Sequence, residues 1–495
     1  MSDSKTSYQQ ILKTASLFGG VQFFTIIFSV IRTKLIAIFI GPAGMGIISL
    51  LNSTLSVISS FTSLGIETSS VKHVSENYIK ADIDSAAPIV TAIKKLAVIT
   101  GIFGTVITLV LSKWLSILTF GNSDHTFSFV FLSVTLLLKQ LASGELVVLQ
   151  GLRRMKLLAQ ANFYGNLFGL LFSVPFYYFL GIDAILPTII ITSLSALFFA
   201  FLYSKKIKFK KIIIPNKEWK AEGKSIVRLG IMMTVSSLFT LLAAYLIQVY
   251  IGKQGGLEQV GYYNAGFTLL NSYVGVIFTV MSTDYFPKLA AVNDDNVKVR
   301  NSVAEQSFVS ILIITPIIIL FLTFIPLIVK IIYTPKFNAV IPMVCFGILG
   351  MLFRAVSWSM GFVLLAKGDS KMFIRTAVGF SILSFALTVF GYYFCGLEGA
   401  GFSFFVYYII HFIALKIITK KRYNFYFDSD FYLVYFICFV MCAVTFLLRY
   451  LGDPILKYSL MSLMVLMSLI FVLFQINKKV ELRNFLNSIL KRKND

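Results

Sequence analysis

Polar side chains recur on one face of the first two apolar segments of the chain. In the first segment they are spaced three or four apart, which places them on one face of a helix: Gln22, Thr25, Ser29 and Arg32. The second segment repeats the pattern with Asn52, Ser56, Ser59, Ser60, Ser63 and Glu67. Hydroxyl and amide groups in such stripes could line a hydrophilic cavity inside a membrane protein.

Two later segments carry similar stripes. One contains Thr234, Ser237, Tyr245 and Gln248, and the next contains Asn264, Thr268 and Asn271, with Ser282 and Asp284 near its inner end. Helix packing is the alternative explanation, because Ser and Thr often hydrogen-bond across the interfaces of transmembrane helices. Packing is the better explanation for any single serine, whereas four stripes together favour one shared cavity.

Charged side chains inside apolar segments form a second group of candidates, because each costs roughly 2.5 to 3.5 kcal/mol to insert into a membrane. The deep cations are Arg32, Lys139 and Arg354. Their excess over deep anions predicts an anionic substrate, since arginine stays charged and presents a planar fork that matches phosphate oxygens. Three acids are candidate sites for a coupling proton or sodium ion: Glu67, Glu145 and Asp284.

These residues must be positioned by membrane-spanning helices. Of the 495 residues, 57% are hydrophobic and 13% are charged, and the mean hydropathy is +0.83, whereas a soluble domain carries about 25% charged residues. Apolar runs long enough to cross a hydrocarbon core of ~30 Å recur along the chain. They predict an all-α integral membrane protein of about fourteen helices. We expect these at 11–39, 44–69, 90–112, 126–150, 159–180, 183–203, 225–252, 261–281, 303–330, 338–366, 372–393, 396–416, 430–448 and 454–476.

The net charge of +22 could indicate a nucleic-acid partner or the cytoplasmic side of a membrane protein. With the amino terminus inside, about 34 of the Lys and Arg residues fall in cytoplasmic segments and about 6 in external ones. We interpret the largest basic cluster, in residues 204–224, as a linker touching anionic lipid heads rather than an RNA-binding patch. Both termini are then cytoplasmic, the first helix is a span rather than a signal peptide, and no nucleic acid is expected as a partner.

The motifs of hydrolytic and nucleotide-driven chemistry are missing from the sequence. No Walker loop, GxGxxG, HExxH or GxSxG occurs in a suitable context, so we expect neither an enzyme nor an ATP-driven pump. The three histidines lie in distant segments, and the four cysteines are single residues in or near apolar helices. This distribution argues against a disulfide, a metal site or a bound cofactor.

Two weak echoes within the sequence suggest a duplicated architecture. IAIFIGPAGMG resembles IQVYIGKQGG, after which residues 50–52 align with 269–271; residues 149–151 and 366–368 then end corresponding helices. Both copies begin inside, so they predict two parallel six-helix lobes with a substrate site at their interface near the midplane. Chance similarity of apolar helices is the alternative. The expected regions are an N-lobe at 1–203, a basic linker at 204–224, a C-lobe at 225–416, and a terminal helix pair with a basic tail at 417–495.

The sequence resembles the multidrug/oligosaccharidyl-lipid/polysaccharide (MOP) superfamily, and most of all the Wzx-type flippases of bacterial O-antigen and capsule assembly. The resemblance rests on the first helix with Arg32, on IGPAGMG at residues 40–46, and on the two-lobe layout over nearly the whole chain. It implies two six-helix bundles in a V-shaped arrangement. Many Wzx proteins are read as twelve-helix, so the terminal helix pair is a departure, although lipid II flippases also have such a pair.

The resemblance implies that the protein moves an undecaprenyl-pyrophosphate-linked oligosaccharide, an O-antigen or related repeat unit, to the external leaflet of the bacterial inner membrane. Basic groups would then hold pyrophosphate and the polar stripes would hold sugars. The predicted binding residues are Arg32, Lys139, Arg354, Gln22, Thr25, Ser29, Asn52, Ser56 and Asn271. Arg32 is assigned to pyrophosphate by analogy with lipid II flippases. The implied partners are membrane lipids and the polymerase and chain-length proteins of lipopolysaccharide biosynthesis.

Three other functions stay open from the sequence. A cation-coupled drug or metabolite antiporter of the same superfamily would depend on the deep acids rather than on the deep cations. A lipid II flippase would share the mechanism but differ in the substrate. A membrane scaffold or polymerase partner would carry long external loops with paired arginines or acids, and the expected external loops are short.

Overall fold

The computed structural model of the protein describes residues 2–80, 87–207 and 216–480, and no strand occurs within these ranges. The side chains of residues 2–28, including the predicted binding residues Gln22 and Thr25, lie outside the described part. The helices of the amino-terminal half are α1 Ser2–Ser63, α2 Ile66–Lys80, α3 Ala87–Phe120, α4 Thr126–Gly151, α5 Met155–Leu180, η2 Gly181–Ala184, α6 Ile185–Ser204 and α7 Asn216–Gly255. Those that follow are α8 Leu257–Thr268, the π-helical turn η3 Leu269–Val274, α9 Val276–Ala291, α10 Asn296–Ile332, η4 Pro335–Val340, α11 Ile341–Ala366, α12 Ser370–Tyr423, α13 Ser429–Leu448 and α14 Pro454–Val480.

The expected class, an all-α integral membrane protein, is confirmed. Ten helical segments in the described ranges are long and apolar enough to cross a membrane. Three of them each contain two of the helices expected from the sequence: Ser29–Ser63, Met155–Ser204 and Ser370–Tyr423. The number of crossings, about fourteen, stays a prediction.

The first two expected helices run together as α1 because the chain turns without a loop. Gly41 has a φ of +64°, in the left-handed region that glycine adopts without strain, and Pro42 follows it inside the helix. The second of these helices was expected to continue to residue 69, but it ends at Ser63. Leu64 and Gly65 both have a positive φ, which breaks the helix and places Glu67 on α2 instead.

The contacts of the chain divide it into two compact units. Unit 1 consists of the residues up to Lys34 and those from Tyr262 onward, and unit 2 consists of Leu35–Gly261. The lobes expected at 1–203 and 225–416 stay a prediction. Within unit 2, α7 lies against α2 and α3.

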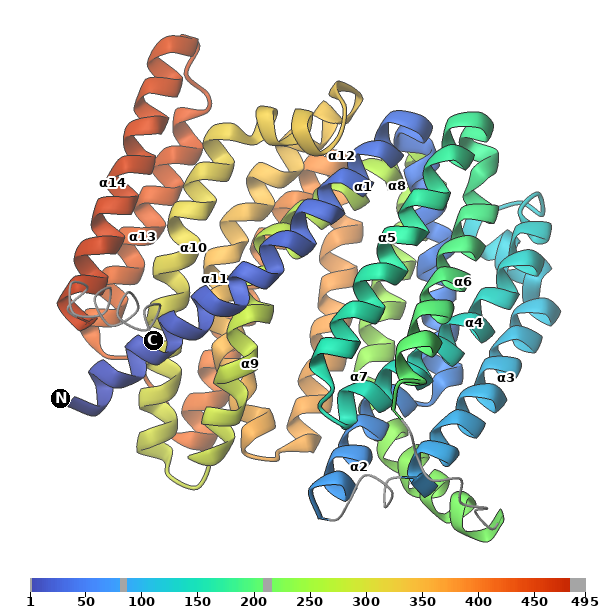
Figure 1. Ribbon diagram of the computed structural model, residues 1–495. Coiled ribbons are helices and arrows are strands. Elements are labelled where there is room, and N and C mark those ends of the chain that lie inside the picture. Colours follow the sequence, from blue (N-terminus) through green and yellow to red (C-terminus); the bar gives the residue numbers. More distant parts are fainter. Residues whose placement is uncertain (1, 81–86, 208–215, 481–495) are drawn as a thin grey trace, which may run out of the picture. The chain divides into compact units, whose positions relative to one another are not determined.

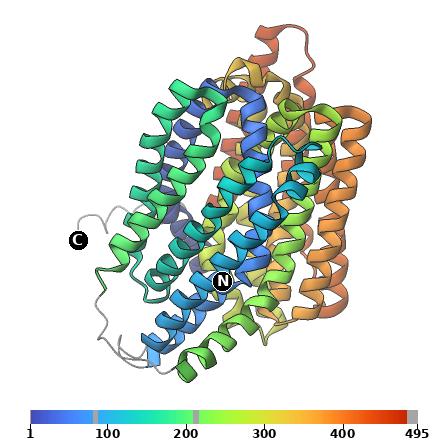
Figure 2. The same ribbon diagram turned by 90° about the vertical axis from the view of Figure 1, so that its right-hand side faces the viewer.

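Unit 2 is built from α2 to α7 and the second part of α1. The pairs α3–α4 and α5–α6 pack along their lengths. Figure 2 shows these helices at the front of the molecule. One core cluster joins α1, α4 and α6, with Leu51, Leu55, Phe129, Leu132 and Ile185 all buried. This cluster holds the polar face of α1 in a fixed direction.

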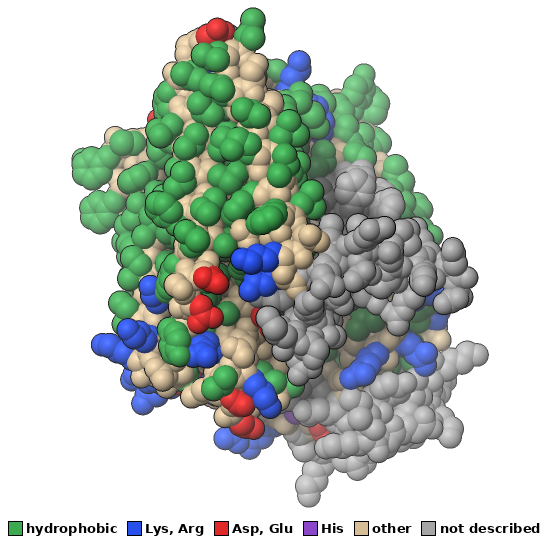
Figure 3. Space-filling model, turned by 90° about the vertical axis from the view of Figure 1, so that its left-hand side faces the viewer, with side chains coloured by type: hydrophobic (Ala, Val, Ile, Leu, Met, Phe, Trp, Pro, Cys, Tyr) green, Lys and Arg blue, Asp and Glu red, His purple; other side chains and the backbone are tan. Residues whose placement is uncertain are grey.

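Unit 1 is organised around α11, which is the most completely buried of the ten apolar segments. It packs against α10 and α12, while α10 also contacts α13 and α14 (Figure 1). The outer face of α14 is apolar and exposed, with Leu466, Ile470 and Phe474 more than half exposed. Figure 3 shows hydrophobic side chains over this face and basic side chains gathered below them, as expected of a surface that meets lipid and then the charged membrane boundary.

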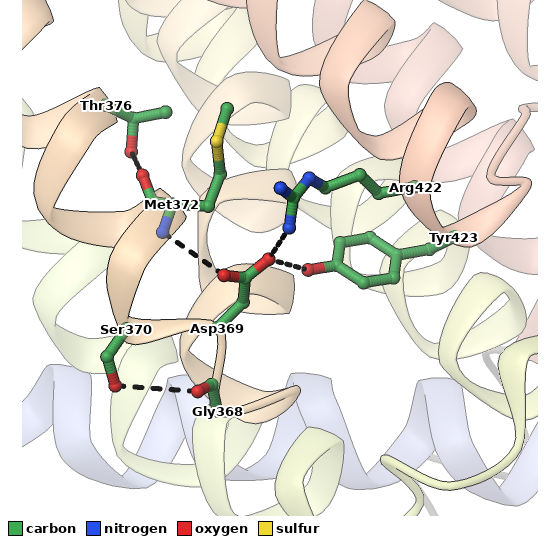
Figure 4. A network of polar contacts seen from close by, with 7 residues as sticks. All are labelled: Gly368, Asp369, Ser370, Met372, Thr376, Arg422 and Tyr423. Carbon is green, nitrogen blue, oxygen red and sulfur yellow. Dashed lines mark hydrogen bonds and ion pairs between the residues drawn. The ribbon is translucent and has the colours of Figure 1, made fainter.

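α12 is a hairpin rather than one straight helix. Its backbone is non-helical at Cys395 and Gly396, and its two ends meet at the side chain of Asp369 (Figure 4). That carboxylate accepts hydrogen bonds from the backbone N–H of Met372 at 3.2 Å, from the hydroxyl of Tyr423 at 3.0 Å, and from the guanidinium of Arg422. Asp369 therefore caps the start of α12 and holds its end.

The turn before α10 lies at the same end of unit 1. The ammonium of Lys367 donates to the carbonyl of Asn293, whose side-chain amide donates to the carbonyl of Ala366 at 3.2 Å. The turns α9–α10 and α11–α12 and the end of α12 are therefore neighbours.

Candidate functional site

A cavity of about 330 Å³ in unit 2 has hydroxyl groups on half of its lining residues, and we call it the serine pocket. Its walls come from α1, α2, α4 and α7. The polar lining residues are Ser56, Ser59, Ser60, Ser63, Glu67, Lys139, Thr234 and Ser237, and the others are Leu55, Gly65, Leu136 and Leu241. Parts of two stripes read from the sequence, on the second and seventh expected helices, thus line one cavity.

The end of the serine pocket is shaped by a close crossing of two backbones. Gly65 has a φ of +65°, and a Cβ built on it would lie 2.2 Å from the carbonyl oxygen of Gly230 on α7. A Cβ on Gly230 would lie 2.2 Å from the carbonyl oxygen of Leu64. Only glycine at both positions lets α7 approach so closely, and this approach places Thr234 and Ser237 opposite the serines of α1.

The serine pocket contains one cation and one anion. Lys139 enters it from α4 and Glu67 from α2, and both side chains are exposed. The pocket can therefore offer hydroxyl donors and acceptors, an ammonium donor and a carboxylate acceptor to a polar ligand. Ser56 donates its hydroxyl hydrogen to the carbonyl of Asn52 at 2.7 Å, while Asn52 itself does not line the pocket.

Two residues of the stripe on α7, Tyr245 and Gln248, form packing contacts and do not line the serine pocket. The amide oxygen of Gln248 accepts hydrogen bonds from Ser49 at 2.8 Å and Ser53 at 3.1 Å. The hydroxyl of Tyr245 lies 2.8 Å from that of Thr119. Both α7 side chains are buried, so the packing alternative holds for this half of the stripe.

A second group of predicted residues meets in unit 1 around Arg354 on α11. Its Nη1 donates to Oδ1 of Asn271 at 2.5 Å. The guanidinium carbon lies 5.2 Å from the ring centre of Phe278 and 5.5 Å from that of Tyr408, so aromatic rings from α9 and α12 face the cation. We call Asn271, Phe278, Arg354 and Tyr408 the Arg354 cluster.

The Arg354 cluster keeps its positive charge without an acidic partner. No carboxylate pairs with Arg354 among the described residues, and its side-chain partners there are the neutral Asn271 and Met351. The amide of Asn271 is itself held by donation to the carbonyl of Phe267 at 3.2 Å. An arginine oriented by an amide and two rings retains donors and full charge for an incoming anion.

Asn271 belongs to η3, a π-helical turn between α8 and α9. Such turns interrupt the regular ladder and are frequent at functional sites. From the same turn, the hydroxyl of Tyr273 lies 3.4 Å from Ser29 and 3.5 Å from Thr33 on α1. The turn therefore connects α1 with the Arg354 cluster inside unit 1.

Arg32 lies on this part of α1, and its side chain is exposed. No described residue pairs with it, and no contact places it in the Arg354 cluster or the serine pocket. Lys34 behaves differently: its ammonium donates to the carbonyls of Lys330, at 2.6 Å, and Tyr333. It thus satisfies carbonyls at the end of α10, where a helix leaves acceptors free.

The three predicted acids occupy three places. Glu67 lines the serine pocket. Glu145 is paired with Lys94 on α3, at 2.8 Å between Oε1 and Nζ. Asp284 lies on α9 in unit 1, with Oδ2 buried and unpartnered among the described residues.

The sequence did not single out Phe278 and Tyr408, or the role of Lys34 at the end of α10. Aromatic residues make up 15% of the sequence, and many of them lie in apolar helices. Nothing in the spacing of these residues marks the two that face the guanidinium of Arg354. The position of Arg354 within an apolar helix was the available signal.

The ten apolar helical segments define a multi-pass membrane protein, and its fold is that of MOP superfamily structures. Its fold is similar to an inward-facing multidrug resistance MATE transporter of the MOP superfamily, with a TM-score of 0.68, 14% identity, and coverage of 84% of this chain and 94% of that one. It is also similar to the lipid II flippase MurJ in an inward closed conformation, with a TM-score of 0.65, 15% identity, and coverage of 93% and 99%. A MOP superfamily transporter from Pyrococcus furiosus gives a TM-score of 0.59 at 12% identity, covering 85% of this chain and 96% of that one.

The chain belongs to the family of polysaccharide biosynthesis proteins, whose model matches residues 35–342. The match spans more than half of the sequence and includes α2 to α10. No curated protein sequence matches the chain. The expected link to polysaccharide biosynthesis and the expected resemblance in fold to MOP superfamily structures are therefore confirmed.

Proposed function

We propose that the protein is a flippase that moves an undecaprenyl-pyrophosphate-linked oligosaccharide, an O-antigen or related surface polysaccharide repeat unit, from the cytoplasmic to the external leaflet. It would act by alternating access in a bacterial inner membrane with both termini in the cytoplasm. The family name supports a role in polysaccharide assembly. The lipid II flippase among the similar structures supports the movement of a lipid-linked glycan.

The single observation that carries the proposal is the uncompensated cation of the Arg354 cluster. A pyrophosphate carries several anionic oxygens, and arginine matches such oxygens in charge and geometry. An exporter of cationic drugs would instead place a carboxylate at the centre of its site. The neutral partner Asn271 orients the guanidinium without cancelling its charge.

The serine pocket suits the second part of the ligand. Sugar hydroxyls act as both donors and acceptors, as do the serine and threonine hydroxyls of α1 and α7. Lys139 adds an ammonium donor there. We assign glycan contacts to this pocket and pyrophosphate contacts to Arg354, with Arg32 as a further cation on α1.

The antiporter alternative keeps one supporting observation, which is the position of Glu67 in a polar pocket. A coupling carboxylate needs access to water or ions, and Glu67 is exposed whereas Glu145 is paired. Replacing Glu67 by Gln should abolish transport in a cation-coupled antiporter. The proposed flippase should retain glycan transport in this variant unless the ion gradient is the energy source.

The decisive experiment compares a deletion strain complemented with wild type, Arg354→Gln or Arg375→Gln at matched expression. Arg375 is an exposed residue of α12 outside both sites, so it is the control. Wild type and R375Q should display glycan, whereas R354Q should accumulate lipid-linked oligosaccharide on the cytoplasmic leaflet. Normal glycan display by R354Q would overturn the proposed site. Rescue of peptidoglycan synthesis by the wild-type protein, in a strain without its lipid II flippase, would overturn the proposed substrate.

A further inference from the structure

A second cavity of unit 2, of about 520 Å³, lies between α3, α4 and α6 and is separate from the serine pocket. We call it the membrane pocket. Most of its walls are apolar, with Leu194, Leu197, Phe198 and Phe201 from α6. Its two charged residues are Lys94 and Glu145, which form the ion pair described above.

Glu145 is incompletely satisfied in this pocket. Its Oε1 accepts from Lys94 at 2.8 Å, but its Oε2 is buried and has no partner among the described residues. The residue is only 8% exposed. A buried carboxylate oxygen without a donor is costly, so an oxygen of this kind indicates a place for a donor from a bound molecule.

Lys94 is the more open member of the pair, with 45% of its side chain exposed. An ammonium group has three N–H donors, and the bond to Glu145 uses one of them. The others remain for an anionic oxygen on the same ligand. The pocket therefore offers one donor group and one acceptor group side by side, with no net charge.

The position of the pocket suits a lipid head group. It lies near the start of α3 and the ends of α4 and α6, and the surrounding surface is apolar, with Val98, Phe198 and Phe201 exposed. Just beyond it, the ammonium of Lys205 lies 4.3 Å from the ring centre of Phe201. Such a change from exposed apolar to basic side chains is typical of the boundary between acyl chains and head groups.

We propose that the membrane pocket binds a zwitterionic phospholipid with a primary ammonium head. The ammonium would donate to Oε2 of Glu145 and the phosphate would accept from Lys94, while an acyl chain would lie along α6. Phosphatidylglycerol would offer the same phosphate to Lys94, but only neutral hydroxyl donors in place of a cation to Oε2 of Glu145. A quaternary ammonium head has no N–H to donate to Oε2.

The test is native mass spectrometry of the whole protein after exchange into equal amounts of phosphatidylethanolamine, phosphatidylcholine and phosphatidylglycerol. Wild type should retain phosphatidylethanolamine about tenfold over each of the others, the effect expected of one hydrogen bond to a charged group. Glu145→Gln should reduce this preference to near unity. Lys113→Met is the control, because this exposed lysine of α3 lies outside the pocket, and it should keep the preference.

Pocket filling provides a second variant that leaves the ion pair intact. Leu194→Trp should lower retention of phosphatidylethanolamine without changing retention of the other two lipids, because Leu194 lines the pocket and is 48% exposed. Equal retention of all three lipids by wild type would overturn the proposal. So would a preference for phosphatidylglycerol, or a preference for phosphatidylethanolamine that survives in both E145Q and L194W.

Discussion

Nη1 of Arg354 lies 2.5 Å from Oδ1 of Asn271, and this bond joins α11 to the π-helical turn η3. The partner is an amide, so it fixes the direction of the guanidinium and leaves the charge available. A carboxylate of the same size at position 271 would form an ion pair with Arg354 and neutralise its charge. The first prediction follows from this difference.

Asn271→Asp should lower glycan transport by roughly tenfold, the effect of about 1.4 kcal/mol, while the protein stays folded. The aspartate would pair with Arg354 and compete with an anionic substrate. Movement of a lipid-linked oligosaccharide between the leaflets of reconstituted vesicles measures the effect. Asn338→Asp, at an exposed position of η4, should leave the rate unchanged, and equal rates for N271D and wild type would contradict the role of the cation.

Arg354→Lys should transport at a rate between those of wild type and R354Q. Lysine keeps the charge but lacks the planar fork, and it stacks less well between Phe278 and Tyr408. The same vesicle assay applies, with the substrate concentration varied to separate binding from turnover. A lysine variant as active as wild type would show that charge alone is required.

Ser60→Phe should narrow the serine pocket and reduce transport by roughly tenfold, because a ring would project into a cavity of about 330 Å³ and displace bound sugar from it. The fold should persist, since Ser60 is only partly buried. Ser123→Phe, at an exposed position before α4, is the matched control. Unimpaired transport by S60F would exclude this pocket from the path of the glycan.

Gly65→Ala should destabilise the protein, by roughly 1 to 3 kcal/mol. The new methyl group would lie 2.2 Å from the carbonyl oxygen of Gly230, at a φ of +65°. Gly379→Ala is the control, since nothing lies within 4 Å of its Cβ position and alanine is favoured over glycine within a helix by about 1 kcal/mol. Thermal unfolding in detergent should show a lower midpoint for G65A and an unchanged or higher one for G379A.

The stability of unit 1 should fall in acid, partly through Asp369. Burial by itself would raise the pKa of this carboxyl, but the N–H of Met372, the hydroxyl of Tyr423 and the guanidinium of Arg422 together bring the pKa below its ordinary value of 3.8. A carboxyl with a lowered folded pKa stabilises the fold above its unfolded pKa, and this contribution is lost as the pH falls through the folded value. Asp369→Asn keeps a cap for α12 but should show a smaller loss of melting temperature between pH 7 and pH 3 than wild type does. Equal losses would show that other groups govern the acid sensitivity.

The sequence predicted the helical class and most of the helix positions, because apolar runs and Gly-containing turns carry that information directly. It also predicted that four polar stripes line one shared cavity, and parts of two of these stripes, Ser56, Ser59, Ser60 and Ser63 with Thr234 and Ser237, line the serine pocket. Periodicity gives the direction of a side chain around its own helix. It does not say which helix lies opposite, and so it could not separate the pocket-lining half of α7 from the packing half with Tyr245 and Gln248.

The neighbours of α7 could not be derived from the order of the helices. It lies against α2 and α3, and Gly230 meets the turn between α1 and α2 at Gly65. Such contacts depend on two glycines far apart in the sequence, Gly65 and Gly230. A single glycine in an apolar segment does not reveal its partner.

The contact between Asp369 and Arg422 joins residues 53 positions apart, at opposite ends of α12. Its ends can meet only if α12 crosses the bilayer an even number of times, so both residues face the same compartment. The hydrogen bond from Lys367 to the carbonyl of Asn293 places the turn before α10 on the same side of the membrane. A reporter enzyme placed between α9 and α10, between α11 and α12, or after α12 must therefore report the same compartment at all three positions. This holds whichever way the protein is inserted.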